Sequence, residues 1–302
     1  MIETEELTKR YSRTTAVNGL SFTVRPGHVT GFLGPNGAGK STTLRIILGL
    51  SDPTSGTATV GGVPFRNRRR GLRHVGALLD AGDVHGGRSA AAHLTALARS
   101  NGIPRRRVAE VLEEAGLAGV TGRRIAGFSL GMKQRLGIAA ALLGDPPVLL
   151  FDEPLNGLDP EGVTWVRGLF QRLAAQGRTV FVSSHLMSEM ENTADQLVVI
   201  GRGELIAAES LAEFAARGVR TAVAVRTPDP AALTAALAAE GAAVRPDGEA
   251  LAVTGLTAAR IGELALQQGV LLNELTTRTS SLEEAFMQLT AGSAEHLAGE
   301  RR

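Results

Sequence analysis

Residues 34–41 could bind a phosphate group. They read Gly-Pro-Asn-Gly-Ala-Gly-Lys-Ser and match the pattern G-x-x-x-x-G-K-[ST] in full. Glycines let backbone N–H groups turn inward around a phosphate, and a following helix points its positive end at the same charge. In this pattern Lys40 reaches the β- and γ-phosphates of a nucleotide, and Ser41 holds Mg²⁺. The residues expected around the phosphates are Gly34, Pro35, Asn36, Gly37, Ala38, Gly39, Lys40, Ser41 and Thr42.

Two adjacent carboxylates, Asp152 and Glu153, follow the wholly apolar run 148–151. Such a run is typical of a strand buried on both faces, and the carboxyl edge of an open α/β sheet faces the crevice where ligands bind. Asp152 would bind Mg²⁺, and Glu153 would orient and deprotonate an attacking water. A Glu at this position favours hydrolysis over phosphoryl transfer to another substrate. The alternative is a solvated strand end without catalytic function.

His185 follows a second apolar run, 179–182, and the pair Ser183-Ser184. A histidine at the carboxyl edge of a strand could contact the γ-phosphate and position the water. A lone histidine is more often structural or merely exposed. The catalytic interpretation of His185 therefore depends on the phosphate loop and the carboxylate pair.

The elements that must position these residues can be predicted from the apolar pattern. We expect strands at residues 21–24, 29–33, 148–151 and 179–182, and a hairpin of 196–200 with 204–206 around Gly201-Arg202-Gly203. Helices are expected at 41–50, 105–116 and 130–143, within a mainly helical stretch at 71–127. The phosphate loop thus lies between a strand and a helix, which argues against a chance glycine-rich turn.

The composition shifts near Arg217-Gly218, and a second pattern begins. Strands are expected at 222–225, 243–245, 250–254 and 270–275, with helices at 230–240 and 258–268. This β-α-β-β-α-β order is that of a split βαβ, or ferredoxin-like, domain. A last helix follows, with Ser281 and Glu284 as a capping box and Leu282, Phe286 and Leu289 on one face.

Composition limits the class of protein. The chain has 302 residues, 43% hydrophobic and 21% charged, which indicates a globular protein with a sizeable core. It has no cysteine, hence no disulfide and no thiolate metal site, which fits a reducing cytosol. We expect no signal peptide, because Glu3, Glu5 and Glu6 lie in the first ten residues, and no transmembrane helix, because charge or glycine interrupts every apolar run.

Arginines cluster at residues 66–73, 105–107 and 123–124, while the formal net charge is only +2. Such clusters could touch anionic lipid or nucleic acid. They lack the interleaved aromatic residues that proteins binding single strands favour. We interpret them as a solvated face and expect no nucleic-acid partner.

The segment 128–135, Phe-Ser-Leu-Gly-Met-Lys-Gln-Arg, resembles the L-S-G-G-Q signature of the ATP-binding cassette (ABC) family. The order of motifs is similar to that family as well: phosphate loop, helical insertion, signature, Asp-Glu strand, a D-loop at 156–159 (Asn-Gly-Leu-Asp), then a switch histidine, His185. Tyr11, the only tyrosine, resembles the aromatic residue that stacks on adenine, although it could be an ordinary surface or core tyrosine. The resemblance covers about residues 1–216.

The resemblance implies a mechanism. Two cassettes would form a homodimer that closes head to tail around two ATP molecules and Mg²⁺. The signature residues Ser129, Leu130, Gly131 and Met132 of one chain would face the nucleotide bound at Lys40 of the other. Asp159 of the D-loop would link the two sites. A signature at the start of a helix also supplies N–H donors and a dipole suited to an anion.

Two departures from the family pattern stand out. The signature has Leu130 and Met132 where Gly and Gln are usual, while the serine and the second glycine are retained. Residues 71–128 contain no glutamine, so the Q-loop residue of the family is missing, and Asp80 aligns best with its position. An aspartate there is a further candidate to approach Mg²⁺, but it is shorter and adds negative charge.

The fold class implied is α/β: a P-loop ABC ATPase cassette with a RecA-like core, an antiparallel β subdomain and a helical subdomain (about 76–142), followed by a small α+β ferredoxin-like domain. The cassette would cover 1–216 and the accessory domain 219–302. The chain resembles single-cassette subunits of bacterial drug or antibiotic exporters, which act with a separate membrane permease on the cytoplasmic side of the plasma membrane. Alternatives are a soluble ABC-type ATPase of DNA repair or translation, or a nucleotide-regulated binding module.

Overall fold

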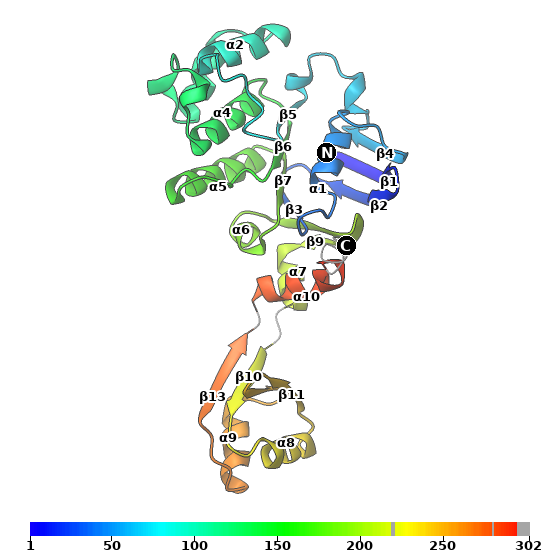
Figure 1. The fold of residues 1–302 in the computed structure, drawn as a ribbon, viewed down its shortest axis with the longest axis vertical. Helices are drawn as coiled ribbons and strands as arrows, with labels where there is room; N and C mark the ends of the chain where they lie inside the picture. Colours follow the sequence, from blue (N-terminus) through cyan, green and yellow to red (C-terminus); the bar gives the residue numbers. More distant parts are fainter. Residues whose placement is uncertain (219–220, 280, 295–302) are drawn as a thin grey trace. The chain divides into compact units, whose positions relative to one another are not determined.

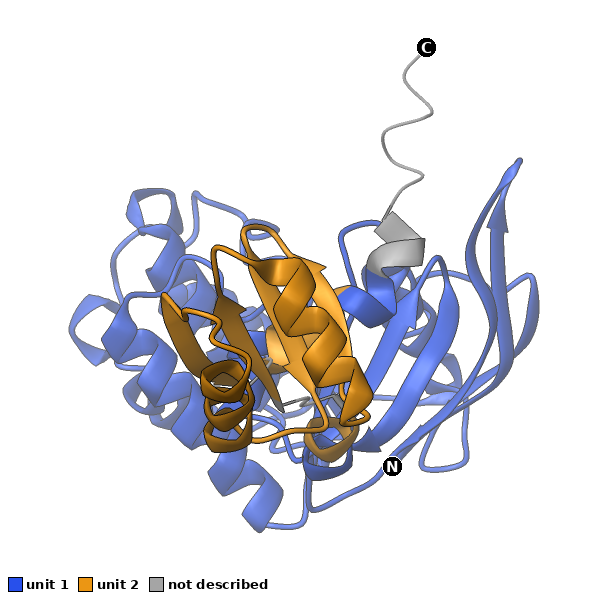
Figure 2. Cartoon of the chain, turned by 90° about the horizontal axis from the view of Figure 1, so that it is seen from below, with its two compact units in different colours: residues 1–213, 288–302 blue, residues 214–287 orange. Residues whose placement is uncertain are grey.

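The computed structural model describes residues 1–218, 221–279 and 281–294. It divides into two compact units, one of Met1–Glu213 with Gln288–Arg302 and the other of Phe214–Met287 (Figure 2). Each unit is described by itself. Among the described residues, no helix combines the length and the apolar character that a membrane span requires.

The first unit is built on a six-stranded sheet in the order β5-β6-β7-β3-β8-β9 (Figure 1). Its strands are β3 (Val29–Leu33), β5 (Val75–Leu78), β6 (Val148–Asp152), β7 (Thr179–Ser184), β8 (Gln196–Gly201) and β9 (Glu204–Ser210). Neighbouring strands from β5 to β8 pair in parallel, and β9 pairs antiparallel with β8. The carboxyl ends of β3, β6 and β7 therefore meet at one edge, where the predicted phosphate loop, carboxylates and histidine begin.

The predicted strands and hairpin of the six-stranded sheet are confirmed, and one of its strands was not predicted. β5 lies within the stretch expected to be mainly helical. Its sequence, Val-Gly-Ala-Leu, has only a weak strand pattern. Gly76 is required there by packing, because a Cβ on it would lie 2.0 Å from the carbonyl oxygen of Ala141.

A second, antiparallel sheet has the order β2-β1-β4, with β1 (Ile2–Tyr11), β2 (Thr14–Val24) and β4 (Ser55–Val60). The rings of Phe22 on β2, Phe32 on β3 and Phe181 on β7 lie 5.0 to 5.8 Å apart between centroids. This aromatic contact joins the two sheets into one core, which also holds α1.

Helices flank the sheets. Their bounds are α1 (Lys40–Ile47), α2 (Ala90–Ser100), α3 (Arg106–Glu114), α4 (Leu130–Leu142), α5 (Pro160–Ala175), α6 (Met187–Glu191) and α7 (Leu211–Gly218). Short 3₁₀ turns lie at Phe65–Asn67, Gly71–Arg73, Ala118–Val120 and Ile125–Gly127. Helices α2, α3 and α4 contact one another and form the helical part of the unit. The predicted helices at 41–50, 105–116 and 130–143 are confirmed within a few residues.

The second unit contains the predicted β-α-β-β-α-β order. Its elements are β10 (Thr221–Arg226), α8 (Pro230–Ala239), β11 (Ala243–Asp247), β12 (Ala250–Thr254), α9 (Ala258–Gln267) and β13 (Glu274–Thr279). The antiparallel sheet has the order β11-β12-β10-β13, and residues of both helices share one core with it. Helix α10 (Leu282–Ala294) begins with the predicted capping box, in which Ser281 and Glu284 bond each other's backbone N–H at 3.1 Å.

The last strand of this unit was predicted four residues too early. The apolar run at 270–275 indicated a strand, whereas Val270 donates its N–H to the carbonyl of Ala265 in the turn that follows helix α9. The ladder begins at Glu274, which pairs with Arg226. Hydrophobicity was misleading because Leu271 is 68% exposed in the connection.

Candidate functional site

The phosphate loop forms one wall of a cleft of about 260 Å³. The cleft is lined by Ala16, Asn36, Gly37, Ala38, Gly39, Lys40, Ser41, Thr42 and Glu153. Seven of these nine residues were predicted at the phosphates, Glu153 was predicted as the base, and Ala16 was not predicted. At Gly39, φ is +102° and a Cβ would lie 2.3 Å from the carbonyl oxygen of Ala16, so only glycine fits. Helix α1 begins at Lys40 and aims its N-terminus into the cleft.

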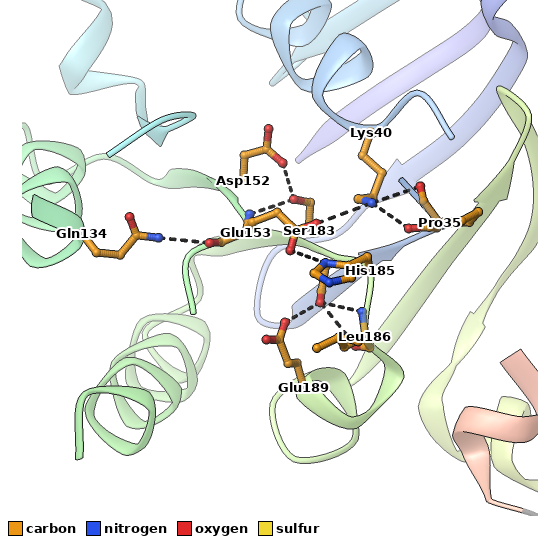
Figure 3. A network of polar contacts seen from close by, with 11 residues as sticks. Pro35, Lys40, Gln134, Asp152, Glu153, Ser183, His185, Leu186 and Glu189 are labelled. Carbon is orange, nitrogen blue, oxygen red and sulfur yellow. Dashed lines mark hydrogen bonds and ion pairs between the residues drawn. The ribbon is translucent and has the colours of Figure 1, made fainter. Parts of the chain in front are cut away.

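Lys40 is held at the floor of this cleft. Its side chain is 7% exposed, and its Nζ atom donates hydrogen bonds to the carbonyl oxygens of Gly34 at 2.6 Å and Pro35 at 3.3 Å (Figure 3). Burial lowers the pKa of the Lys40 ammonium, and the Glu153 carboxylate opposes this shift. A buried ammonium at this position is suited to a phosphate oxygen.

The Glu153 carboxylate joins the lysine to the histidine. Its Oε1 atom lies 3.5 Å from Lys40 Nζ, and its Oε2 atom lies 2.9 Å from His185 Nδ1. Ser183 orders the backbone here, because its hydroxyl donates to Asp152 Oδ1 at 2.5 Å and accepts the N–H of Glu153 at 3.0 Å. The structure thus brings together four residues that the sequence singled out on three different strand ends.

A partly buried carboxylate that was not predicted lies beside this group. Glu189 on α6 accepts a hydrogen bond from the hydroxyl of Ser184, which directly precedes His185. Burial raises the pKa of Glu189, the Ser184 hydrogen bond opposes this, and the Glu153 carboxylate adds to it. No sequence pattern distinguishes Glu189 from the exposed acids around it.

The signature residues lie at the start of α4 and outside the described lining of the cleft. Ser129 caps the helix, and its hydroxyl accepts the N–H of Met132 at 3.2 Å. Leu130 is 55% exposed. Asp159 caps α5 in the same way and accepts the N–H of Gly162 at 2.9 Å. Both predicted trans-acting segments are therefore helix N-termini with side-chain caps.

Two predicted residues lie away from the cleft lining. Asp80 follows β5 and accepts the N–H of Gly82 at 2.6 Å within its own turn. Tyr11 ends β1 with 49% of its surface exposed, and the Lys9 ammonium lies 5.0 Å from its ring centroid. The geometry leaves the Tyr11 ring accessible for stacking.

Oxygen atoms suited to Mg²⁺ are present beside the phosphate loop. The described residues contain no group of three or more His, Cys, Asp and Glu side chains that could hold a metal alone. Mg²⁺ usually takes one or two protein ligands and shares substrate phosphates and water. The Ser41 hydroxyl in the cleft and the Asp152 carboxylate at the end of β6 fit that donor set.

A phosphate loop between β3 and α1, with an Asp-Glu pair at the end of a buried parallel strand, defines a P-loop nucleotide-binding protein. Comparison with known proteins narrows this class. A family profile described as ABC transporter matches residues 17–156, and a profile described as a domain of unknown function (DUF8746) matches residues 221–283.

Relatives extend the match along the chain. A Bacillus subtilis protein, described as the uncharacterized ABC transporter ATP-binding protein YhcH, is 32% identical over 300 residues, 98% of each chain. The bacitracin transport ATP-binding protein BcrA of Bacillus licheniformis is 43% identical over 209 residues, 68% of each chain. A solved structure of an ATP-binding subunit of an ABC transporter is 27% identical with a TM-score of 0.66, and the match covers 72% of this chain and 92% of that one. The chain belongs to the ABC transporter family as an ATP-binding subunit, and it hydrolyses ATP.

Proposed function

We propose that this chain powers a separate membrane permease that exports a drug or antibiotic. The similarity to BcrA, a bacitracin transport protein, supports this substrate class. The permease would be contacted through the helical part of the first unit, and the chain would work at the cytoplasmic side of the plasma membrane. The division into a cassette (1–216) and an accessory domain (219–302) belongs to the same proposal, with the accessory domain serving regulation or dimer stability.

The observation that carries the catalytic part is the position of Glu153. Its carboxylate lies on the wall of the phosphate cleft, between Lys40 and His185. Lys40 and the loop N–H groups would hold the β- and γ-phosphates. Glu153 would take the proton of the attacking water, and His185 would orient that water and contact the γ-phosphate. Tyr11 would stack on the adenine.

Ser41 and Asp152 would hold Mg²⁺, with Asp80 as a further candidate. Mg²⁺ supplies neutralisation of the phosphate charge when it is bound. The hydrogen bond from Ser183 to Asp152 supports this role, because it fixes one carboxylate oxygen, and the described residues show no hydrogen bond to the other. Asp80 would have to give up its bond to Gly82 to take part.

The cassette would act as a homodimer. Ser129, Leu130, Gly131 and Met132 begin a helix of 13 residues and do not line the described cleft of their own chain. They would complete the ATP site of a second copy, where the capped helix N-terminus would face the γ-phosphate. Asp159 would contact the partner copy across the interface.

Glu153→Gln tests the assignment of the base. The variant retains the shape of the side chain but cannot accept a proton, so we expect kcat to fall by about 10²–10⁴-fold while ATP binding persists. The measurement is steady-state phosphate release, with binding of a fluorescent ATP analogue alongside. Glu113→Gln on the exposed face of α3 is the matched control. Normal turnover of Glu153→Gln would show that another group is the base.

Coupling to a permease is tested separately. The full chain would be expressed with the membrane protein of a neighbouring gene and purified from membranes. We expect the two to co-purify, and candidate antibiotics to raise ATP hydrolysis by the complex. A chain that stays out of the membrane fraction with every such partner would favour a soluble ABC-type ATPase instead.

A further inference from the structure

Gln134 on α4 connects the signature helix to the peptide backbone of Glu153. Its side chain is 4% exposed, and its Nε2 atom donates a hydrogen bond of 3.0 Å to the carbonyl oxygen of Glu153 (Figure 3). A buried amide is costly unless it is hydrogen-bonded, so this contact fixes the side chain in place. The function proposed above does not use Gln134.

Glu153 needs such support because its backbone is in an unusual conformation. Its φ of +49° lies in the left-handed region, which costs about 1–2 kcal/mol for a residue with a Cβ. Conformations of this kind persist where the surroundings fix them. The N–H of Glu153 is held by Ser183, and the carbonyl accepts from Gln134 and, at 3.3 Å, from the N–H of Asn156. Without Gln134, the longer bond from Asn156, within the same turn, is the one that the described residues still give to this carbonyl.

Two further contacts hold α4 against the segment that follows Glu153. A Cβ on Gly157 would lie 2.3 Å from Leu130 Cδ2, so the Leu130 side chain rests directly on that glycine. The Arg135 guanidinium carbon lies 4.7 Å from the ring centroid of Trp165 on α5. The donor of Gln134 lies between these two anchors along the helix, so its position relative to Glu153 is well defined.

We propose that Gln134 is a positioning residue that holds the Glu153 carboxylate in its working orientation. This inference rests on the proposed function, in which Glu153 is the base. Residues 71–128 contain no glutamine, and Asp80 bonds within its own turn. Among the hydrogen bonds of the described residues, the bond from Gln134 is the one that joins a glutamine side chain to Glu153.

The experiment compares two substitutions in the full chain. Gln134→Leu keeps the approximate volume and removes the donor, whereas Gln134→His places a ring nitrogen the same number of bonds from Cα and retains a donor. We expect kcat of the Leu variant to fall about tenfold to hundredfold, with KM for ATP within about twofold of the wild type. The His variant should recover most of the lost kcat. Gln171→Leu, the same change at an exposed position of α5, should match the wild type.

Other results would overturn the proposal in distinguishable ways. If Gln134→Leu kept the wild-type kcat, no hydrogen-bond donor would be needed at this position. The same conclusion would follow if kcat fell equally in Gln134→Leu and Gln134→His, because the donor of the histidine would then restore nothing. Should Gln134→Leu fail to fold by circular dichroism, Gln134→Met replaces it, because its unbranched side chain fits the same space. Glu153→Gln is assayed in parallel. If that variant hydrolyses ATP normally, the proposed base is wrong, whereas an inactive Glu153→Gln beside an unaffected Gln134→Leu overturns only the role of Gln134.

Discussion

The six-stranded sheet of the first unit and the four-stranded sheet of the second unit use charged residues in opposite ways. In the first, parallel strands end together, and Lys40 and Glu153 form an ion pair with 7% and 21% exposed side chains. In the second, neighbouring strands pair antiparallel, so their carboxyl ends are divided between two opposite edges of the sheet. Its ion pairs, such as Arg226 with Glu249, are exposed by 49% and 85%.

The exposure of these ion pairs indicates what the charges contribute in each unit. Exposed ion pairs contribute about 0–1 kcal/mol each, so the charges of the second unit add little beyond solubility. A buried charge such as the Lys40 ammonium, whose pKa is lowered by burial, costs stability. Proteins retain such charges where chemistry needs them. Hydrolysis should therefore depend on a few residues of the first unit and tolerate changes in the second.

Lys40→Ala should give the largest effect. Removing the buried ammonium takes away the group aimed at the phosphates, so we expect kcat/KM for ATP to fall by at least about 10²–10³-fold. Steady-state phosphate release measures this. Arg45→Ala, which removes a cation from the exposed face of the same helix, should leave kcat/KM unchanged. If kcat/KM fell equally in both variants, the overall positive charge of α1, and not the position of Lys40, would account for ATP binding.

Leu233→Ala tests the other side of the comparison. Leu233 on α8 is fully buried in the core of the second unit, so its truncation should destabilise that unit by about 2–5 kcal/mol. Hydrogen exchange of β10 and β12 should become faster, while ATP turnover stays within about twofold of the wild type. A parallel loss of turnover would break the comparison, because hydrolysis would then depend on the packing of the second unit.

Glu189→Gln should give the smallest effect, in the pH dependence of stability. Burial raises the pKa of Glu189 above 4.5, so its contribution is fully present below that pH and is lost as the pH rises through the raised value. The wild type should lose more stability than the variant between about pH 4 and neutrality. The difference should be below about 1.4 kcal/mol, one pK unit, because the side chain is partly exposed. The midpoints of urea unfolding at each pH measure this difference, with Glu191→Gln as the control. If stability depended on pH in the same way in the wild type and in Glu189→Gln, the prediction would be wrong.

The sequence predicted the elements that carry the site because their patterns are local. The phosphate loop is a contiguous motif, and the apolar runs before Asp152 and Ser183 have no alternation because both faces of the sheet are covered. The strand at 270–275 was misplaced because an apolar run does not reveal whether it is exposed.

Long-range partners were the part that the sequence could not supply. The contact between Glu153 and His185 joins residues 32 positions apart, and that between Gln134 and Glu153 joins residues 19 apart. Burial of a polar side chain such as Gln134 follows from tertiary packing, which the helical pattern alone does not encode. The residue types of the site were predictable, and the pairing that fixes their geometry was not.

The most direct test of the whole account is the mass of Glu153→Gln with ATP and Mg²⁺, measured by light scattering. If a nucleotide held at Lys40 is closed over by the Ser129 helix of another molecule, the variant should have twice the 31.5 kDa of one chain and return to that mass when ATP is removed. Adding Ser129→Arg should prevent the doubling. A protein that binds ATP at Lys40 and stays at the mass of a single chain, with its permease present, would contradict the account.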